Sequence, residues 1–128
     1  MSVEIGLRGQ ASMQASQKYT AEAWGSGDVP VFGTPSLVAL LETAAVNAVA
    51  GRLGPGETTV GTWLDVSHLA ATPVGMEVRA EAELITIEGR KLTFVVVAYD
   101  TREKIGECRH HRLIVSRDRF LAKAAGKQ

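Results

Sequence analysis

The sequence lacks several features that would assign it to common protein classes. It has one cysteine, Cys108, among 128 residues, so no disulfide can form within the chain. Lys and Arg number 14, as do Asp and Glu, and this zero net charge argues against a general nucleic-acid binder. No apolar run approaches the roughly 18 residues of a membrane-spanning helix. The first ten residues hold no signal-peptide core. We therefore expect a soluble cytoplasmic protein with no membrane or nucleic-acid partner.

The length and the cysteine count also limit the cofactor classes. A chain of 128 residues suits a single domain, 1–128, that can bury a core without a metal or a disulfide. No Cys/His spacing typical of zinc is present, and the glycines do not follow the strand–loop–helix pattern of a nucleotide site. We expect neither a metal nor a cofactor. Cys108 is more typical of a small buried residue than of a nucleophile.

What the chain does contain is one strongly apolar stretch, "VFGTPSLVALLETAAVNAVAGRL", over residues 31–53. Thr34 suits a helix N-cap, Pro35 suits the first helical position and Gly51 suits the end. Apolar residues fall on every side of the predicted helix, which is typical of a buried helix. Glu42 lies in the middle, and a buried carboxylate is costly unless it has a partner. The sequence therefore raises the question of what Glu42 does there.

Most of the remaining chain has the period-two alternation of strands. We expect a first strand near residues 5–16 and four more, over 58–68, 75–84, 92–100 and 105–116. A hairpin at Gly89 and a turn at 101–104 join the last three, and a short helix over 117–127 ends the chain. One buried helix wrapped by an antiparallel sheet is the hot-dog arrangement, an α+β fold. An open sheet leaves unpaired edge strands, so we expect a homodimer, with a tetramer left open.

His68 and Glu42 form the first candidate site. Alternation over residues 58–68 predicts one common face for Val60, Thr62, Leu64, Val66 and His68. If that face covers the helix, His68 points toward the element that carries Glu42. The two side chains could form a pair that only satisfies the core, or they could perform acid–base or nucleophilic chemistry. Thr34 likewise could cap the helix or help its first N–H groups to hold an oxyanion.

Three segments resemble the fluoroacetyl-CoA-thioesterase-like family of hot-dog thioesterases. They are "GSGDVPVFGTPSLVALLE", "VGTWLDVSHLAATPVGMEV" and "EGRKLTFVVVAYD", and the resemblance covers roughly residues 31–115. The resemblance implies an acyl-CoA substrate and a catalytic set of Thr34, Glu42 and His68. It also implies that Gly61 lies near the thioester and Arg112 near the CoA end.

The segment before the helix departs from the family pattern. The fluoroacetyl-specific enzymes carry phenylalanines there, whereas "KYTAEAWGSGDVPVF" offers Tyr19, Trp24 and Phe32. We expect Phe32 to contact the substrate. The scaffold and the catalytic set carry over from the resemblance, but the fluoroacetyl specificity does not.

Geometry adds one constraint of its own. Thr34 and Glu42 are separated by eight residues, or about 12 Å along one helix, so both cannot touch one carbonyl from the same helix. We therefore expect an active site shared across a dimer, with the subunit that supplies His68 left open. The expected reaction is thioester hydrolysis, with Glu42 as nucleophile or general base.

Two alternative functions remain open at this point. One is a hot-dog dehydratase or hydratase that acts on enoyl thioesters. The other is a non-catalytic module that binds acyl-CoA. Arg109, Arg112, Arg117 and Arg119 are close in sequence, and they could be ordinary surface charge or a landing site for CoA phosphates.

Overall fold

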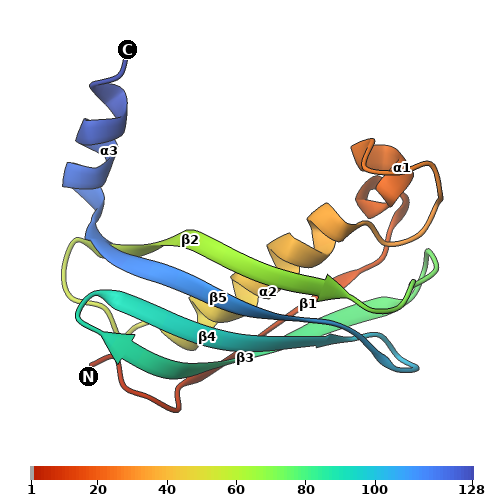
Figure 1. Ribbon diagram of the computed structural model, residues 1–128, viewed down its shortest axis with the longest axis horizontal. Helices are drawn as coiled ribbons and strands as arrows, with labels where there is room; N and C mark the ends of the chain where they lie inside the picture. The colour runs from red at the N-terminus through yellow and green to blue at the C-terminus, as the bar shows by residue number, and fades with distance from the viewer. Residues whose placement is uncertain (1) are drawn as a thin grey trace.

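The protein is a five-stranded antiparallel sheet curled around one long helix (Figure 1). The computed structural model describes residues 2–128. The sheet order is β1-β3-β4-β5-β2. Its strands are β1 (Arg8–Gln14), β2 (Glu57–His68), β3 (Glu77–Glu88), β4 (Lys91–Tyr99) and β5 (Lys104–Ser116). The helices are a 3-10 turn η1 (Gln17–Tyr19), α1 (Ala21–Trp24), α2 (Thr34–Ala48) and α3 (Arg117–Ala125). The predicted α+β hot-dog architecture is confirmed.

The core lies between α2 and the concave face of the sheet. The helix contributes buried aliphatic residues at the spacing of one helical face: Leu37, Leu40, Leu41, Ala44, Ala45 and Ala48. Alternate residues of β3 and β4 face them, so each of these strands has one buried and one outer side. β1 approaches the helix at Gly9, where any Cβ would collide with the backbone of Ala44 and Ala48. Glycine at this position therefore allows the sheet to close around α2.

One side of α2 is open in the single chain. Ala39, Thr43 and Val46 are exposed, and Val46 retains 42% of its accessible surface. β2 is one of the two edge strands of the sheet, and within residues 2–128 it pairs with β5 alone. The prediction that α2 is buried all round is therefore wrong for one chain, because the sheet covers only part of the helix circumference.

A β-bulge in β2 changes which residues face the core. The pairing of β2 with β5 shifts between Gly61 and Trp63. Gly61 pairs with the buried Arg112, so it faces inward, whereas Val60 pairs with the exposed Leu113 on the outer face. The predicted common face is therefore wrong at Val60, since one extra residue resets the alternation.

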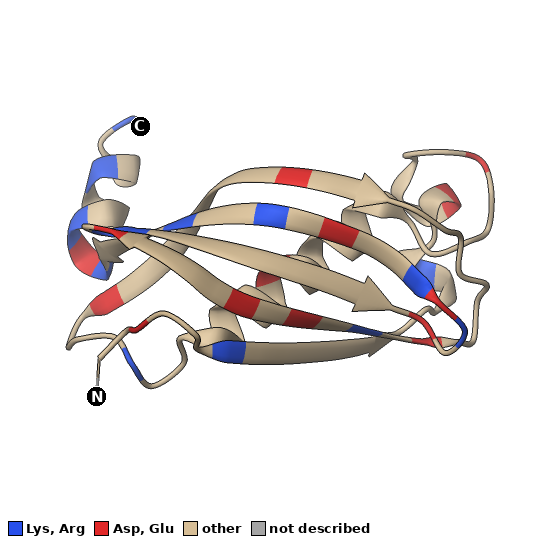
Figure 2. Cartoon of the chain, turned by 60° about the horizontal axis from the view of Figure 1, so that its bottom comes forward, with Lys and Arg blue, Asp and Glu red and all other residues tan. Residues whose placement is uncertain are grey.

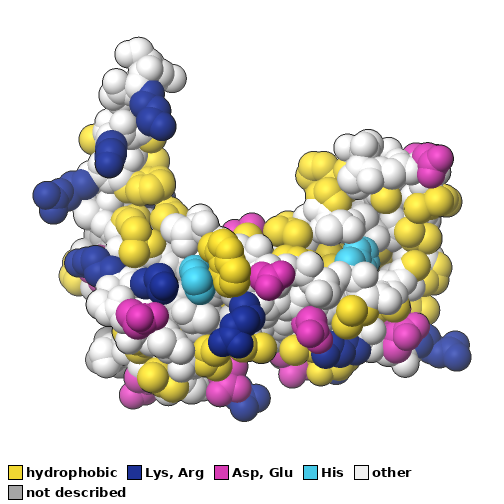
Figure 3. Space-filling model, viewed as in Figure 1, with side chains coloured by type: hydrophobic (Ala, Val, Ile, Leu, Met, Phe, Trp, Pro, Cys, Tyr) yellow, Lys and Arg dark blue, Asp and Glu magenta, His cyan; other side chains and the backbone are white. Residues whose placement is uncertain are grey.

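The two ends of the molecule rise on the same side of the sheet. α1 and the loop after it lie at one end and α3 stands off the other, next to β5 (Figure 1). Figure 3 shows hydrophobic side chains at both ends of the hollow between them. Two hydrophobic residues of α3, Phe120 and Leu121, are exposed. Acidic and basic residues are spread along the strands rather than gathered in one patch (Figure 2). No helix within residues 2–128 is long and apolar enough to cross a membrane.

Candidate active site

The first half of the candidate site lies where α2 begins. Thr34 is the first residue of the helix, and its Oγ1 lies 2.8 Å from Nδ1 of His68, the last residue of β2. Gly33 occupies the N-cap position and makes no side-chain cap bond. The prediction of Thr34 as the N-cap is therefore wrong, and its hydroxyl contacts the histidine instead. The structure brings Thr34 and His68 together within one chain.

His68 is half-buried, and this sets its protonation state. Burial lowers the pKa of His68 below its ordinary value of 6.5, while the backbone of Ala70 acts in the opposite direction. The ring therefore favours its neutral form near pH 7, in which one ring nitrogen can accept a proton. Within residues 2–128, the buried Nε2 atom has no hydrogen-bond partner. Such a ring can act as a base or shuttle a proton beside Thr34.

The segment before α2 is tied to the start of the helix. The indole N–H of Trp24 donates to Oγ of Ser36 at 2.7 Å, and the Ser36 hydroxyl donates to the carbonyl of Tyr19 at 3.1 Å. Phe32 is 1% exposed and belongs to the core cluster. Its contact with substrate stays a prediction. The first N–H groups of any helix lack intrahelical partners, so the start of α2 favours negative charge.

The second half of the site lies in the middle of α2. Nη1 of Arg112 donates to Oε2 of Glu42 at 3.3 Å, and Nε2 of His110 lies 4.0 Å from the same oxygen. The Arg112 side chain is 8% exposed, whereas that of Glu42 is 36% exposed. Glu42 is thus held from the protein side and remains open toward solvent. Within one chain Glu42 and His68 do not pair, because Glu42 contacts Arg112 and His68 contacts Thr34.

Arg112 is fixed by more than its carboxylate. Its Nε donates to Oγ1 of Thr59 at 2.9 Å, its Nη2 donates to the carbonyl of Thr59 at 3.2 Å, and its Nη1 donates to Nε2 of His110 at 3.1 Å. Burial lowers the pKa of Arg112, and Glu42 offsets this effect. A role for Arg112 at the CoA end stays a prediction. Arg109 is exposed on the opposite face of β5, so these two arginines do not form one cluster.

Gly61 gives Glu42 the space that it needs. A Cβ at position 61 would lie 2.5 Å from Oε2 of Glu42 and 3.2 Å from Nη1 of Arg112. Any larger residue there would displace the carboxylate or the guanidinium. Gly61 therefore lies next to Glu42, as expected for a position near the reacting groups. A direct contact of Gly61 with a thioester stays a prediction.

Two members of this network, His110 and Thr59, were not identified from the sequence. Cys108, His110 and Arg112 alternate along β5 and share its concave face, because each is buried at period two. That alternation was the available signal for His110. Cys108 is confirmed as a small buried residue, and burial, with the Glu42 and Asp65 charges, raises the pKa of its thiol to about 12.

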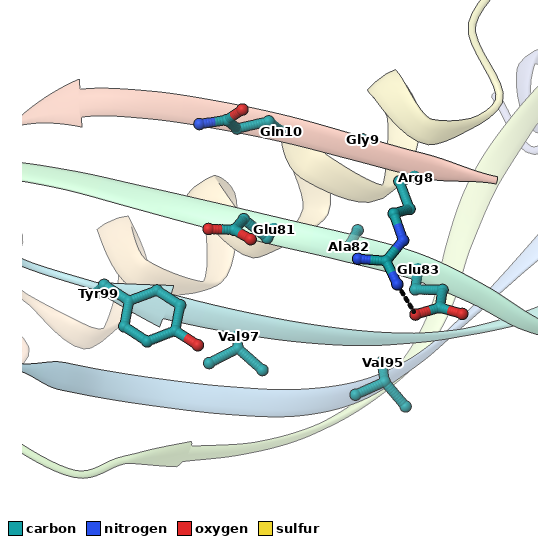
Figure 4. A pocket seen from close by; sticks show the side chains of 9 residues that line it. All are labelled: Arg8, Gly9, Gln10, Glu81, Ala82, Glu83, Val95, Val97 and Tyr99. Atoms are coloured by element: carbon teal, nitrogen blue, oxygen red, sulfur yellow. Dashed lines mark ion pairs between the residues drawn. The ribbon is translucent and has the colours of Figure 1, made fainter. Parts of the chain in front are cut away.

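A shallow pocket on the outer face of the sheet lies away from this chemistry (Figure 4). Val95, Val97 and Tyr99 of β4 form its floor, and an exposed ion pair of 3.2 Å between Arg8 and Glu83 borders it. It contains none of the predicted site residues. Within residues 2–128, no three His, Cys, Asp or Glu side chains are grouped so that they could hold a metal ion.

Comparisons with known proteins agree on one family for this chain. The model of the fluoroacetyl-CoA-specific thioesterase family matches residues 15–118. The chain belongs to this family. It is 43% identical over 97 residues to the fluoroacetyl-CoA thioesterase of Streptantibioticus cattleyicolor, across 76% of this chain and 70% of that protein. As a member of this family, it is a thioester hydrolase.

Solved structures support the same assignment. A crystal structure of the fluoroacetyl-CoA thioesterase FlK is 34% identical and superposes with a TM-score of 0.92, covering 100% of this chain and 99% of that one. A hypothetical protein of Thermus thermophilus, described as a thioesterase superfamily member, is 26% identical. It superposes with a TM-score of 0.89 over 96% of this chain and 91% of its own.

Proposed function

We propose that this protein hydrolyses a small acyl-CoA thioester at an active site shared between the two protomers of a homodimer. One observation carries the proposal: the predicted catalytic residues form two separate groups within a single chain. Thr34 and His68 meet at the start of α2. Glu42 lies eight residues after Thr34 on the same helix, and it pairs with Arg112. At about 1.5 Å per residue these halves are about 12 Å apart along the helix, too far for both to act on one carbonyl.

A two-fold axis along the open side of the molecule would join complementary halves. β2 pairs with β5 on one side only, and α2 exposes Val46. Pairing of two β2 edges antiparallel would also set the two α2 helices antiparallel, since the same patch is used on both subunits. The start of one helix would then face the middle of the other. Thr34 and His68 of one subunit would thus receive Glu42 of the partner subunit.

The chemistry follows from these roles. The substrate carbonyl lies at the start of α2, where N–H groups and Thr34 stabilise the developing oxyanion. Glu42 attacks the carbonyl carbon or activates a water that does so, and the carbon–sulfur bond breaks. In the general-base route, Glu42 takes the proton of the attacking water, and the neutral His68 relays that proton to the leaving thiolate. In the nucleophilic route, the acyl group forms an anhydride with Glu42, and the water that hydrolyses this anhydride supplies, through His68, the proton that the thiolate takes up. Water adds in total, and the products are a carboxylate and the free CoA thiol.

Mixed dimers test the shared site directly. We expect Thr34→Ala and Glu42→Gln proteins to be nearly inactive alone and to recover activity when they are unfolded together and refolded as a mixture. Random assortment makes about half of the dimers mixed, each with one intact site, so about a quarter of wild-type activity should return. Thiol release from acetyl-CoA provides the readout, and sedimentation confirms the dimer.

A second mixture provides the control. Thr34 and His68 belong to the same chain, so mixing Thr34→Ala with His68→Ala leaves every site of the mixed dimer damaged. This mixture should stay inactive. Mixed dimers of Thr34→Ala and Glu42→Gln that recover no activity would refute the shared arrangement, and an active monomer would refute it as well. Recovery in the second mixture would show that Thr34 and His68 of one site come from different subunits.

The acyl group is a narrower part of the proposal. We infer that the pocket does not favour fluoroacetyl groups. The segment before α2 carries Tyr19, Trp24 and Phe32, whereas we expect the fluoroacetyl-specific enzymes to carry phenylalanines throughout this segment. The ratio of kcat/KM for fluoroacetyl-CoA and acetyl-CoA tests this. A preference of several orders of magnitude for the fluorinated substrate would contradict it. A cytoplasmic location, inferred from the single cysteine, belongs to the same proposal.

The same assays separate the two alternative functions. A dehydratase would hydrate an enoyl thioester without releasing thiol. A binding module would bind acyl-CoA without turnover. The Thr34–His68 contact favours an enzyme over a binding module, because a binding module needs no proton-transfer pair at the helix start.

A further inference from the structure

We propose that His110 is a positioning residue for Glu42 and that it acts through Arg112. The inference rests on the proposed role of Glu42 in hydrolysis. His110 lies in the middle of β5 and is 0% exposed, so it cannot touch substrate. Its ring nonetheless reaches the group that holds Glu42. Burying a histidine beside an ion pair is costly, because burial disfavours its charged form and leaves any ring nitrogen without a hydrogen-bond partner unsatisfied.

The contacts of His110 assign its tautomer. Nδ1 lies 2.9 Å from the carbonyl oxygen of Trp63, which can only accept, so Nδ1 carries the proton and donates. Nε2 lies 3.1 Å from Nη1 of Arg112, which can only donate, so Nε2 is the acceptor. Both ring nitrogens are thus satisfied in one neutral form. The ring presents a lone pair to Arg112.

The neutral form is also the form that the surroundings favour. Burial lowers the pKa of His110 below its ordinary value. The Trp63 carbonyl opposes this, and the nearby Arg112 lowers the pKa further. Glu42 from α2 and His111 on the same strand contribute smaller effects of opposite sign. A protonated ring would point a second N–H at a guanidinium that also only donates, so the network requires the neutral ring.

The position of Nη1 decides the position of Glu42. This one nitrogen donates both to Oε2 of Glu42 and to Nε2 of His110. Thr59 holds the other two guanidinium nitrogens, so only Nη1 is positioned by His110. The guanidinium is planar and rigid, so loss of the acceptor on His110 would let the whole group turn about its bonds to Thr59, which shifts Nη1 and the carboxylate with it. A displacement of about 1 Å at a reacting group can cost about 10²-fold in rate.

The bulge in β2 supports the network at both ends. Thr59 and Trp63 lie on either side of the register shift, and they bind Arg112 and His110 respectively. Gly61, between them, leaves room for the Glu42 carboxylate. The same local irregularity therefore anchors the guanidinium, orients the imidazole and admits the carboxylate. This arrangement links the unusual backbone of β2 to the geometry of the reacting group.

Two substitutions of His110 separate its two hydrogen bonds. His110→Asn places an amide near the Nδ1 position and so keeps the donor to Trp63, but it loses the acceptor for Arg112. His110→Gln places its amide near the Nε2 position and so keeps that acceptor. We expect His110→Asn to lower kcat roughly tenfold or more with KM within about threefold, and His110→Gln to regain most of the loss. His111→Asn, on the opposite face of β5, is the matched control and should leave kcat unchanged.

The pathway through Arg112 is tested in an Arg112→Gln background. There His110→Asn should change kcat by less than about twofold, because the two residues act in series. Each variant is checked for the dimer and for its melting temperature. Equal kcat losses in folded His110→Asn and His110→Gln, or a loss of stability without any change in kcat, would overturn the proposal. If wild-type protein releases no thiol from any acyl-CoA, the proposed function fails first, and a positioning role for His110 fails with it.

Discussion

The start and the middle of α2 differ in how many contacts hold their functional side chains. At the start, Thr34 and His68 share one contact of 2.8 Å, and Thr34 is exposed. In the middle, Glu42 is one member of a network in which the partner guanidinium makes four hydrogen bonds. The first region is open to solvent and has few contacts, which suits groups that contact substrate. The second is closed on the protein side, which suits a charge that must be kept in one place.

The largest test of this comparison removes the charge from the middle. Glu42→Gln keeps the size of the side chain and its hydrogen bond to Arg112 but removes the carboxylate. We expect turnover to fall by about 10²–10⁴, as for loss of a positioned base or nucleophile. Steady-state thiol release from acetyl-CoA measures it.

The same variant has a stability readout. From the sequence alone, loss of a buried charge would leave the melting temperature unchanged or raise it. The Arg112 contact reverses that expectation, since the nearly buried guanidinium loses its counter-charge. Glu42 is about one-third exposed, so the loss should be about 1 kcal/mol or less. A folded dimer with full activity would exclude Glu42 from catalysis.

A smaller effect is expected when the carboxylate is moved rather than removed. Gly61→Ala adds a Cβ that would lie 2.5 Å from Oε2 of Glu42, so Glu42 must shift. We expect kcat to fall by about tenfold with a folded dimer, because a carboxylate can move toward solvent. Gly27→Ala is the control, since its Cβ would meet only the Ala21 side chain at an ordinary 3.5 Å. Full activity of Gly61→Ala would show that the position of Glu42 tolerates movement.

The smallest expected effect is a decrease in the free energy of unfolding at acidic pH, caused by His68 at the start of α2 and His110 near its middle. Burial lowers the folded-state pKa of His68 and of His110 below 6.5. As the pH falls below 6.5, the unfolded chain therefore binds protons first, and the free energy of unfolding decreases. The full stabilisation is present above pH 6.5. Urea unfolding at pH 7 and pH 5 should show the decrease.

Glu57 does not contribute to the decrease between pH 7 and pH 5. The N–H of Gly54 and the guanidinium of Arg90 lower the pKa of Glu57, so its contribution is lost only below its ordinary value of 4.5. His110→Asn should flatten the change between pH 7 and pH 5. A wild-type protein that becomes more stable over the same fall in pH would contradict the assignment of neutral histidines.

The sequence predicts the fold better than it predicts the contacts of the site. Regular alternation in β3 and β5, and the Pro35 to Gly51 stretch around α2, depend on local patterns that one chain displays in full. The long distance between Thr34 and Glu42 also follows from helix geometry alone. These parts need no knowledge of which elements lie side by side.

The partner of Glu42 could not be predicted in the same way. A bulge at Gly61–Trp63 changes which residues of β2 face the core, and no residue type in the sequence predicts this bulge. Arg112 follows Glu42 by 70 positions, so their pairing depends on the strand order rather than on spacing. An arginine near the end of an alternating strand is more often solvent-exposed. Arg112 is buried because it lies on the concave face of β5, which the sequence alone does not reveal.

The buried position of Cys108 has a practical consequence for measuring the reaction. With a thiol pKa of about 12, only about one molecule in 10⁵ carries a thiolate at pH 7. The thiolate is the form that reacts with disulfide reagents and peroxide. An enzyme that releases a thiol as product thus has its own thiol shielded from the same chemistry. Chromogenic thiol reagents can follow turnover continuously without labelling the catalyst.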